Sequence, residues 1–387
     1  VIMETLLIII FICSILCIFW AMIGYGVSLK IISRLKTINP AKRTDEKPSV
    51  TVMIVAHNEQ KVIREKLENV LNNDYPTEKI KYLVTSDHST DSTNKIVEEF
   101  ILRHNDKPIT LYTSKEHKGK TNAQNEAQKL VDTDILVMTD ANSMFQTNSI
   151  SELISSFSDD NIAYVCGALI FTNTSNLTAT SESNYWSREL KTRLIESNIQ
   201  TITAGNGAIY ACRNKDYIEI QPIECHDISM PYYYGMHHKR AIFNEKALAF
   251  EKAGESTEDE YKRKVRMNRI ILMQLKKGVK ALNIFKYGWF SYFYFGHRTS
   301  RYLLWLNHLL AFVSNFGLML MAHGIWTYLF WLQMLFYVLG IIGKYTKNKL
   351  LYMVYYYCIT IFAQWHGVIN ILTGKSKPTW DSVSSTR

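Results

Sequence analysis

The apolar positions along this chain of 387 residues first mark out long segments without charge. Residues 5–29, 302–343 and 350–374 contain no Asp, Glu, Lys or Arg. A helix crosses the roughly 30 Å hydrocarbon core of a bilayer with about 20 apolar residues. We therefore predict four membrane segments: Leu6–Val27, Tyr302–Ala322, Ile325–Gly343 and Leu350–Leu372. Buried helices of a large soluble core are the alternative.

Charge next to the first segment predicts its orientation. Glu4 stands where a signal peptide has basic residues, and no small-residue cleavage site follows, so residues 1–30 are expected to be a retained anchor. Basic residues follow directly, which by the positive-inside rule predicts a multi-pass protein of the cell (inner or plasma) membrane with its next region in the cytoplasm. These residues are Lys30, Arg34, Lys36, Lys42 and Arg43.

The net charge of +9 also bears on the partners. Much of it flanks the apolar segments, and no nucleic-acid-binding motif accompanies it, so we interpret it as contact with the lipid bilayer and expect no nucleic acid partner. The tail, residues 375–387, gives a conflict. Three spans after a cytoplasmic region would leave it outside, whereas Lys375 and Lys377 favour the inside. Either the tail is external, or the stretch Phe362–Leu372 is re-entrant.

Between the apolar segments, residues 49–280 have the composition of a globular domain with a second pattern. Short apolar runs alternate with amphipathic helical stretches, which predicts an α/β fold with a mostly parallel sheet. The expected strands are 50–55, 82–85, 109–112 and 135–139, and the expected helices are 62–71, 93–104 and 120–131. Ligands of such sheets bind beyond the carboxyl ends of the strands.

Polar residues stand at the ends of three of these strands. They are His57, Asn58 and Glu59 after the first, Asp87 after the second, and Asp140 with Asn142 after the fourth. Each cluster alone is ordinary turn chemistry, but three at one edge predict a site. The chain has no P-loop and no Gly-x-Gly-x-x-Gly, so phosphates would need another counter-charge. Mg²⁺ or Mn²⁺ held by Asp140 and Asn142, together with Lys120, would supply it.

In this order the motifs resemble those of the membrane-embedded family 2 glycosyltransferases, which include poly-N-acetylglucosamine, chitin, hyaluronan and cellulose synthases. The resemblance runs from about Val50 to the C-terminus and implies an A-type glycosyltransferase domain with transmembrane helices on both sides. The matching stretches are VTVMIVAHNE (50–59), TSDHSTDST (85–93), GKTNAQN (119–125) and TDAN (139–142). They imply that His57, Asn58, Glu59, Asp87, Lys120 and Asp140 bind the nucleotide, with Asp87 on the uracil, and that Asp140 and Asn142 hold the metal. His88 stands where the family has Gly.

The later motifs imply the acceptor side. GNGAIYACR (205–213) resembles the family's acceptor-side segment and implicates Gly205 and Asn206, and HDISMP (226–231) makes Asp227 the base. Such a base needs a carboxylate within hydrogen-bond reach of the attacking hydroxyl. The triplet Thr257-Glu258-Asp259 resembles the usual setting of that base, but its position indicates a helix N-terminus instead.

Three further stretches resemble the family less closely. YKRKVRMNR (261–269) stands where the family often has Gln-x-x-Arg-Trp, so Arg266 would hold the departing diphosphate and Arg263 would lie near the acceptor. The Gln and Trp are missing, and a basic helix facing solvent or lipid headgroups is the alternative. The aromatic and basic segment 281–301 is expected to lie at the membrane interface, followed by about three spans in 302–374. Trp380 resembles a C-terminal tryptophan that related synthases keep near the active site.

The resemblance implies an inverting, metal-dependent transferase. It would move a sugar from a nucleotide-sugar onto a growing polysaccharide, with coupled export. The expected donor is a UDP-sugar, and UDP-N-acetylglucosamine is the first candidate. Accessory export or assembly proteins would be further partners. One alternative is a non-processive transferase that adds one sugar to a lipid-linked or glycan acceptor. Another is an inactive membrane scaffold of a glycan-assembly complex.

Overall fold

The computed structural model describes residues 1–35, 40–173, 177–254 and 256–379, which divide into two compact units. The first unit comprises Val1–Lys36, Ser175–Ser181 and Ser256–Ser376. The second unit comprises Thr37–Thr174, Glu182–Glu255 and Lys377–Arg387. Residues 256–280, expected to close the catalytic domain, thus belong to the first unit, and the start of the tail belongs to the second.

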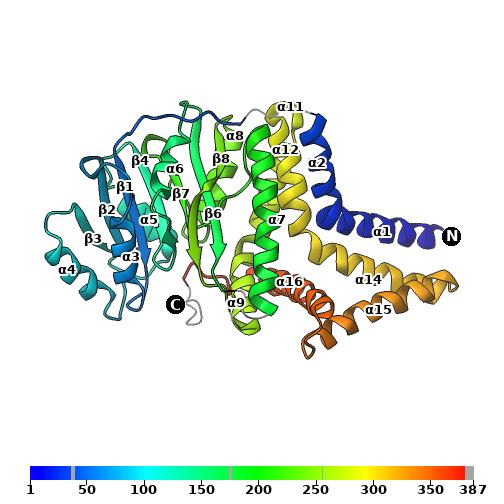
Figure 1. Ribbon diagram of the computed structural model, residues 1–387. Coiled ribbons are helices and arrows are strands. Elements are labelled where there is room, and N and C mark those ends of the chain that lie inside the picture. Colours follow the sequence, from blue (N-terminus) through cyan, green and yellow to red (C-terminus); the bar gives the residue numbers. More distant parts are fainter. Residues whose placement is uncertain (36–39, 174–176, 255, 380–387) are drawn as a thin grey trace. The chain divides into compact units, whose positions relative to one another are not determined.

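The second unit is built on an eight-stranded sheet with the order β3-β2-β1-β4-β7-β6-β8-β5 (Figure 1). The strands are β1 (Val50–Ala56), β2 (Ile80–Ser86), β3 (Ile109–Thr113), β4 (Ile135–Asp140), β5 (Met144–Phe145), β6 (Ile162–Phe171), β7 (Tyr210–Arg213) and β8 (Arg240–Glu251).

The first four strands confirm the predicted parallel half. β1 lies between β2 and β4 and is parallel to both, and β3 extends the sheet beyond β2. All seven residues of β1 are buried, as a strand covered on both faces requires, and this explains its unbroken apolar sequence.

The other half of the sheet is mixed rather than parallel. β7 is antiparallel to both of its neighbours, β4 and β6, whereas β6 and β8 are parallel. Because β7 runs against β4, the loop that precedes β7 lies at the same edge of the sheet as the residues that follow β4. The sequence pattern had indicated only the parallel part.

Helices of the second unit complete the layers, and α3, α4 and α5 confirm the three predicted helices. The buried Ile63, Leu67 and Val70 form the core-facing stripe of α3. The elements are α3 (Ile63–Leu71), η2 (Thr77–Lys79), α4 (Thr93–Arg103), α5 (Lys120–Gln128), α6 (Ser149–Ser155), most of α7 (Leu177–Ile199), η3 (Asn214–Asp216) and α8 (His226–Met236).

The first unit is helical. Among the residues described, three helical segments are long and apolar enough to cross a membrane: Ile2–Leu35, Leu304–Met321 and Ile325–Gly343. Its elements are α1 (Ile2–Phe19), η1 (Trp20–Gly24), α2 (Tyr25–Leu35), α9 (Thr257–Met267), η4 (Asn268–Ile270), α10 (Ile271–Lys280), α11 (Ile284–Tyr287), α12 (Trp289–Phe293), η5 (Tyr294–Thr299), α13 (Ser300–Tyr302), α14 (Leu304–Met321), α15 (Ile325–Gly343) and α16 (Lys349–Leu372).

The fourth predicted segment forms α16, which does not reach the hydropathy of a span. α16 packs against α15 and α9, and it buries polar as well as apolar side chains (Figure 1). Gln364 is one of these. Its amide accepts from Trp305 N at 3.1 Å and donates to Arg301 O at 2.9 Å, and so it satisfies backbone groups near the start of α14.

Candidate active site

The polar clusters predicted at the strand ends do converge at one edge of the sheet. The Asp87 amide donates to Ala56 O at 2.9 Å, which joins the residue after β2 to the last residue of β1. His57 Nδ1 lies 2.7 Å from Asp87 O. β1, β2 and β4 are parallel, so Asp140, the last residue of β4, ends at this edge too.

Asn58 and Glu59 fix the loop that follows β1. Asn58 adopts a φ of 55°, a left-handed conformation that Asn tolerates, and its Oδ1 accepts from Thr90 N at 2.8 Å. Glu59 is buried, and its backbone N–H donates to Thr93 Oγ1 at 2.8 Å. Both residues thereby join the end of β1 to the start of α4. Their contact with a nucleotide stays a prediction.

Asp87 is the buried centre of a second loop. Its carboxylate accepts from Lys118 N at 3.2 Å and Gly119 N at 3.0 Å, and it lies 2.8 Å from His117 Nδ1. The His117 ring stacks on His57 with centroids 3.9 Å apart and planes 12° apart. Asp87 and an imidazole face are therefore presented together at the predicted nucleobase position.

His57, Asp87 and His117 also lie close enough to be considered as metal ligands, with one ligand atom from each within 4.8 Å of the others. An imidazole nitrogen binds Zn²⁺ in the plane of its ring at about 2.0–2.1 Å. Two nearly parallel rings 3.9 Å apart cannot both meet that requirement for one ion. The arrangement fits a stacking surface better than a metal centre.

Lys120 and Asp140 form an ion pair at the carboxyl end of β4. Burial lowers the pKa of Lys120, but the charges of Asp140 and then Asp227 outweigh this and raise it. Gly207 lies against the pair: a Cβ atom there would be 2.9 Å from Lys120 Nζ and 3.2 Å from Asp140 Oδ2. The glycine thus leaves space beside both charged groups that any other residue would fill.

The residues at this point fit a divalent cation. The Asp140 carboxylate is 32% exposed, and Asn142 is half-buried two residues later. Carboxylate and amide oxygens are hard ligands that suit Mg²⁺ or Mn²⁺, which usually complete their shell with waters and substrate phosphates. The cradle left by Gly207 gives room for such a ligand. Asp140 and Asn142 are therefore the residues that would hold the ion.

Asp227 lies in the first turn of α8. Asp227 O accepts from Gly205 N at 2.6 Å, and Thr121 Oγ1 in the first turn of α5 donates to Glu224 O at 2.7 Å. These bonds hold the starts of α5 and α8 together. Lys120 and Asp227 therefore stand at neighbouring helix N-termini, close enough for the Asp227 charge to act on Lys120.

His226, the residue before Asp227, ties the start of α8 to α5 through hydrogen bonds of its ring. Its ring contacts Gln124 Oε1 at 3.0 Å, Asn125 Oδ1 at 3.0 Å and Tyr217 OH at 2.7 Å. Burial, and then the positive charge of Lys120, lower the pKa of His226 to about 3. The ring is neutral at physiological pH and fixes the start of α8 against α5.

Gly205 and Asn206 shape the loop before β7. A Cβ atom at Gly205 would collide with the Tyr164 hydroxyl. Asn206 is buried: its Nδ2 donates to Gly167 O at 2.8 Å, and its Oδ1 accepts from Ala208 N and Ile209 N, both at 3.1 Å. The amide of Asn206 is thus used within the loop, and contact with an acceptor stays a prediction for both residues.

Arg263 and Arg266 belong to α9 of the first unit. Arg263 holds the buried Glu260 with two nitrogens, at 2.7 and 2.9 Å. Burial raises the pKa of Glu260, but Arg263 and then Lys264 outweigh it and lower that pKa to about 2. The action of both arginines on acceptor or diphosphate stays a prediction.

Two expectations outside the sheet edge can also be compared. Ser256 caps α9 by accepting from Asp259 N at 3.0 Å, so the triplet 257–259 is a helix N-terminus as predicted. Trp380 lies outside the described residues. Just before it, Pro378 O would be 2.7 Å from a Cβ at Gly119, whose φ is 96°. The described start of the tail therefore lies against the loop that holds Asp87.

Sequence reasoning missed several residues of this site. They are Lys66, His117, Gly207 and His226. Lys66 lies on the apolar stripe of α3 between Ile63 and Val70, but a lone lysine on an amphipathic helix is normally exposed, so its burial gave no signal. Gly207 gave no signal, because its closeness to Lys120 depends on the antiparallel course of β7.

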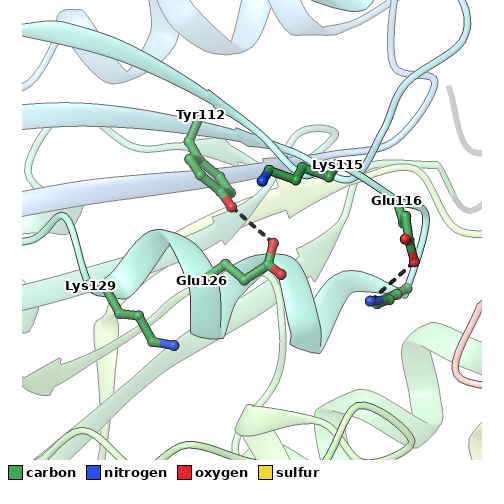
Figure 2. A pocket seen from close by; sticks show the side chains of 6 residues that line it. Tyr112, Lys115, Glu116, Glu126 and Lys129 are labelled. Carbon is green, nitrogen blue, oxygen red and sulfur yellow. Dashed lines mark hydrogen bonds and ion pairs between the residues drawn. The ribbon is translucent and has the colours of Figure 1, made fainter.

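A pocket of about 330 Å³ opens beside the loop between β3 and α5 (Figure 2). Tyr112 OH donates to Glu126 Oε2 at 3.0 Å, and Lys118 pairs with Glu116 at 3.1 Å. None of the side chains that line it belongs to the predicted site. They are Tyr112, Lys115, Glu116, Lys118, Glu126 and Lys129.

Comparison with known proteins agrees with this fold. The family described as glycosyl transferase family 2 matches residues 51–219. The chain is 31% identical over 116 residues to the probable glycosyltransferase YdaM of Bacillus subtilis, over 30% of this chain and 28% of that protein. It is 29% identical over 133 residues to hyaluronan synthase of Streptococcus pyogenes, over 34% of this chain and 32% of that protein. These matches span less than two thirds of either relative.

A solved structure extends the likeness of fold. The mannosyltransferase PcManGT from Pyrobaculum calidifontis superposes with a TM-score of 0.73 at 18% identity, covering 96% of this chain and 99% of that one. The likeness includes the mixed sheet, which is typical of A-type glycosyltransferases. The fold and the sequence matches thus agree: residues 51–219 of this chain form a glycosyl transferase family 2 domain.

Proposed function

We propose that the chain is an inverting glycosyltransferase that takes its sugar from a nucleoside diphosphate sugar. The observation that carries the proposal is the Lys120–Asp140 pair with Asp227 beside it at the carboxyl edge of the sheet. The site thus combines a cation for the diphosphate, a carboxylate for the metal and a second carboxylate for the acceptor. Each lies on the start of a helix or the end of a strand and is held by backbone bonds.

Asp227 is proposed as the base. Its carboxylate would take the proton of the acceptor hydroxyl as that oxygen attacks the anomeric carbon, while the bond from this carbon to the diphosphate breaks. Attack opposite the leaving group inverts the anomeric configuration. Lys120 would stabilise the negative charge that develops on the diphosphate. Mg²⁺ or Mn²⁺ on Asp140 and Asn142 would supply Lewis-acid stabilisation of the same charge.

The proposed donor is a uridine diphosphate sugar, and UDP-N-acetylglucosamine is the first candidate. At the predicted nucleobase position, the Asp87 carboxylate would accept a hydrogen bond from N3–H of uracil or from N1–H of guanine. The solved mannosyltransferase is a complex with GDP-Man and Mn²⁺. Guanosine diphosphate sugars are therefore the donors to test against uridine diphosphate sugars.

Two acceptors are proposed. A growing polysaccharide, with coupled export, is supported by the likeness to hyaluronan synthase. Single addition to a lipid-linked or glycan acceptor is supported by α9, where Arg263 is engaged by Glu260 and Met267 stands in place of the family's Trp.

We further propose a multi-pass protein of the cell membrane with its catalytic unit in the cytoplasm. Two candidate spans, α14 and α15, follow the second unit in sequence, and an even number of spans would return the chain to its starting side. The contact of Pro378 with Gly119 supports the same side for the tail. This topology would remove the conflict raised by Lys375 and Lys377.

The test uses the full chain in lipid nanodiscs with a panel of uridine and guanosine diphosphate sugars, with and without Mn²⁺ or Mg²⁺. Released diphosphate and product length are measured together, for the wild type and Asp227→Asn. Metal-dependent turnover that falls by about 10²–10⁴-fold in the variant supports the proposal. Long products support the synthase, and single additions support the non-processive enzyme. Neither turnover nor nucleotide binding with any donor would leave only the scaffold.

A further inference from the structure

Lys66 is a buried cation in the helix behind the metal motif. It lies on α3, between Ile63 and Val70 of the apolar stripe, and its side chain is fully buried. Leu or Met would fill such a position without the cost of removing an ammonium from water. A lysine is therefore expected here only if its nitrogen does something that an apolar side chain cannot do.

The Lys66 nitrogen bridges the two sides of the turn that carries Asp140 and Asn142. Nζ donates to Thr139 Oγ1 at 3.0 Å, immediately before Asp140, and to Ser143 O, immediately after Asn142. The remaining side of the ammonium lies 3.9 Å from the centre of the Phe145 ring. The two hydrogen bonds thus clamp the metal turn at both of its ends.

The clamp extends to the loop on the far side of the site. Thr139 Oγ1 donates to Ala208 O at 2.7 Å, next to Gly207, and Ser143 Oγ donates to Glu251. One chain of bonds therefore runs from Lys66 through Thr139 to the loop that leaves space beside Lys120 and Asp140.

We propose that Lys66 is a positioning residue that holds the Asp140–Asn142 turn in its metal-binding geometry and so sets the affinity of the enzyme for its divalent cation. The inference rests on the proposed function for the identity of that turn. A ligand turn held within about 0.5 Å keeps its affinity, whereas one released by a lost support does not. Loss of a support of this kind typically costs 10–100-fold in metal affinity.

A competing effect has the opposite sign. Burial lowers the pKa of Lys66 to about 7, while Asp140 and Glu251 favour the charged form. A charged Lys66 repels a cation, so its removal by itself would strengthen metal binding. An amine of either charge still donates two hydrogen bonds, and hence the clamp persists where the charge does not. The two effects predict opposite results for the same substitution.

The experiment measures Mn²⁺ binding by the full chain in nanodiscs, from the electron paramagnetic resonance signal of free Mn²⁺, with Mn²⁺ alone and with added uridine or guanosine diphosphate. The variants are Lys66→Met, which removes both hydrogen bonds and charge, and Thr139→Val, which breaks the chain of bonds but keeps the amine. Lys61→Met, an exposed lysine just before α3, is the matched control. Melting temperature is recorded for each.

We expect the Mn²⁺ dissociation constant to rise about 10–100-fold in Lys66→Met and less in Thr139→Val, with partial rescue in Lys66→Arg and no change in Lys61→Met. Unchanged or tighter Mn²⁺ binding in folded Lys66→Met would overturn the inference. If Lys66→Met does not fold, unchanged binding in Thr139→Val does so. Because binding is read without turnover, the clamp can fail while the transferase stands. Absence of Mn²⁺ binding and turnover in the wild type would instead remove the proposed function, and the inference with it.

Discussion

Gly207 lies so close to Lys120 that a Cβ atom added to the glycine would be 2.9 Å from Nζ. Gly207→Ala must therefore displace the Lys120–Asp140 pair or fill the space beside it. We expect turnover to fall about 10²-fold, the order of loss that follows a 1 Å misplacement, with an unchanged melting temperature. Gly26→Ala is the control, because nothing lies within 4 Å of its added Cβ. Full activity in Gly207→Ala would mean that this space is not used.

Two residues at the strand ends, Asn58 and His88, have a left-handed backbone conformation. Substituting each by glycine should change the free energy of unfolding in opposite directions. His88 has a φ of 52° and an exposed side chain, so His88→Gly relieves about 1–2 kcal/mol of strain and loses about 0.5–1 kcal/mol through the freer unfolded chain. The free energy of unfolding should therefore rise by about 0–1.5 kcal/mol.

Asn58, with a φ of 55°, also uses its Oδ1 to accept from Thr90 N. Asn58→Gly should therefore lower the free energy of unfolding by about 1 kcal/mol. Denaturant titration of both variants checks the pair of signs, and destabilisation by His88→Gly would refute the strain argument.

The low pKa of His226 predicts that the second unit loses stability as the pH falls. Its pKa is about 3 in the folded state and about 6.5 in an unfolded chain, so the unfolded state alone binds a proton between these values. The stability contribution is complete above pH about 6.5 and is lost as the pH falls. By linkage the loss is about 2 kcal/mol at pH about 5. The melting temperature measured at pH about 7.5 and about 5 should fall more in the wild type than in His226→Gln. Equal shifts would show that another group is responsible.

Substitution of Arg263 distinguishes a structural role of this residue, seen in stability, from a catalytic role, seen in turnover. Its two bonds to the buried Glu260 stabilise the carboxylate, which keeps Lys264 and Tyr356 if Arg263 is removed. Arg263→Ala should therefore cost on the order of 1–3 kcal/mol, less than the 3–5 kcal/mol of a buried pair broken outright. Activity should fall only in proportion to the folded fraction, measured by melting and turnover on the same preparation. A larger loss of turnover than of folded protein would instead favour a direct action on the acceptor.

The parallel half of the sheet could be predicted closely from the sequence. Buried parallel strands are continuous apolar runs, such as Val50–Ala56, and the polar residue that ends each run marks the ligand edge. Asp87 and Asp140 were therefore found by pattern alone, and so was Lys120 at the start of α5. That α16 spans the membrane stays a prediction, because the absence of charged residues does not reveal that a helix buries Gln364 against a neighbour.

The later part of the site could not be derived in this way. Gly207 and Asp227 do not follow a parallel strand, since one precedes an antiparallel strand and the other begins a helix. Only the family resemblance pointed to Asp227. Lys66 was missed because a single lysine on a short amphipathic helix is normally exposed, and its burial depends on the polar groups of a turn far along the chain.

The order of these elements has a consequence for synthesis on the ribosome. β1 to β4 emerge consecutively and pair with one another, so the loops of Asp87 and Asp140 can form while the rest of the chain is still being made. Gly207 and Asp227 arrive only after β6 and α7, when β7 docks against β4. A half-made chain would thus have the strand ends that carry Asp87 and Asp140 before it has Asp227, so the proposed nucleotide site would form before the proposed base arrives.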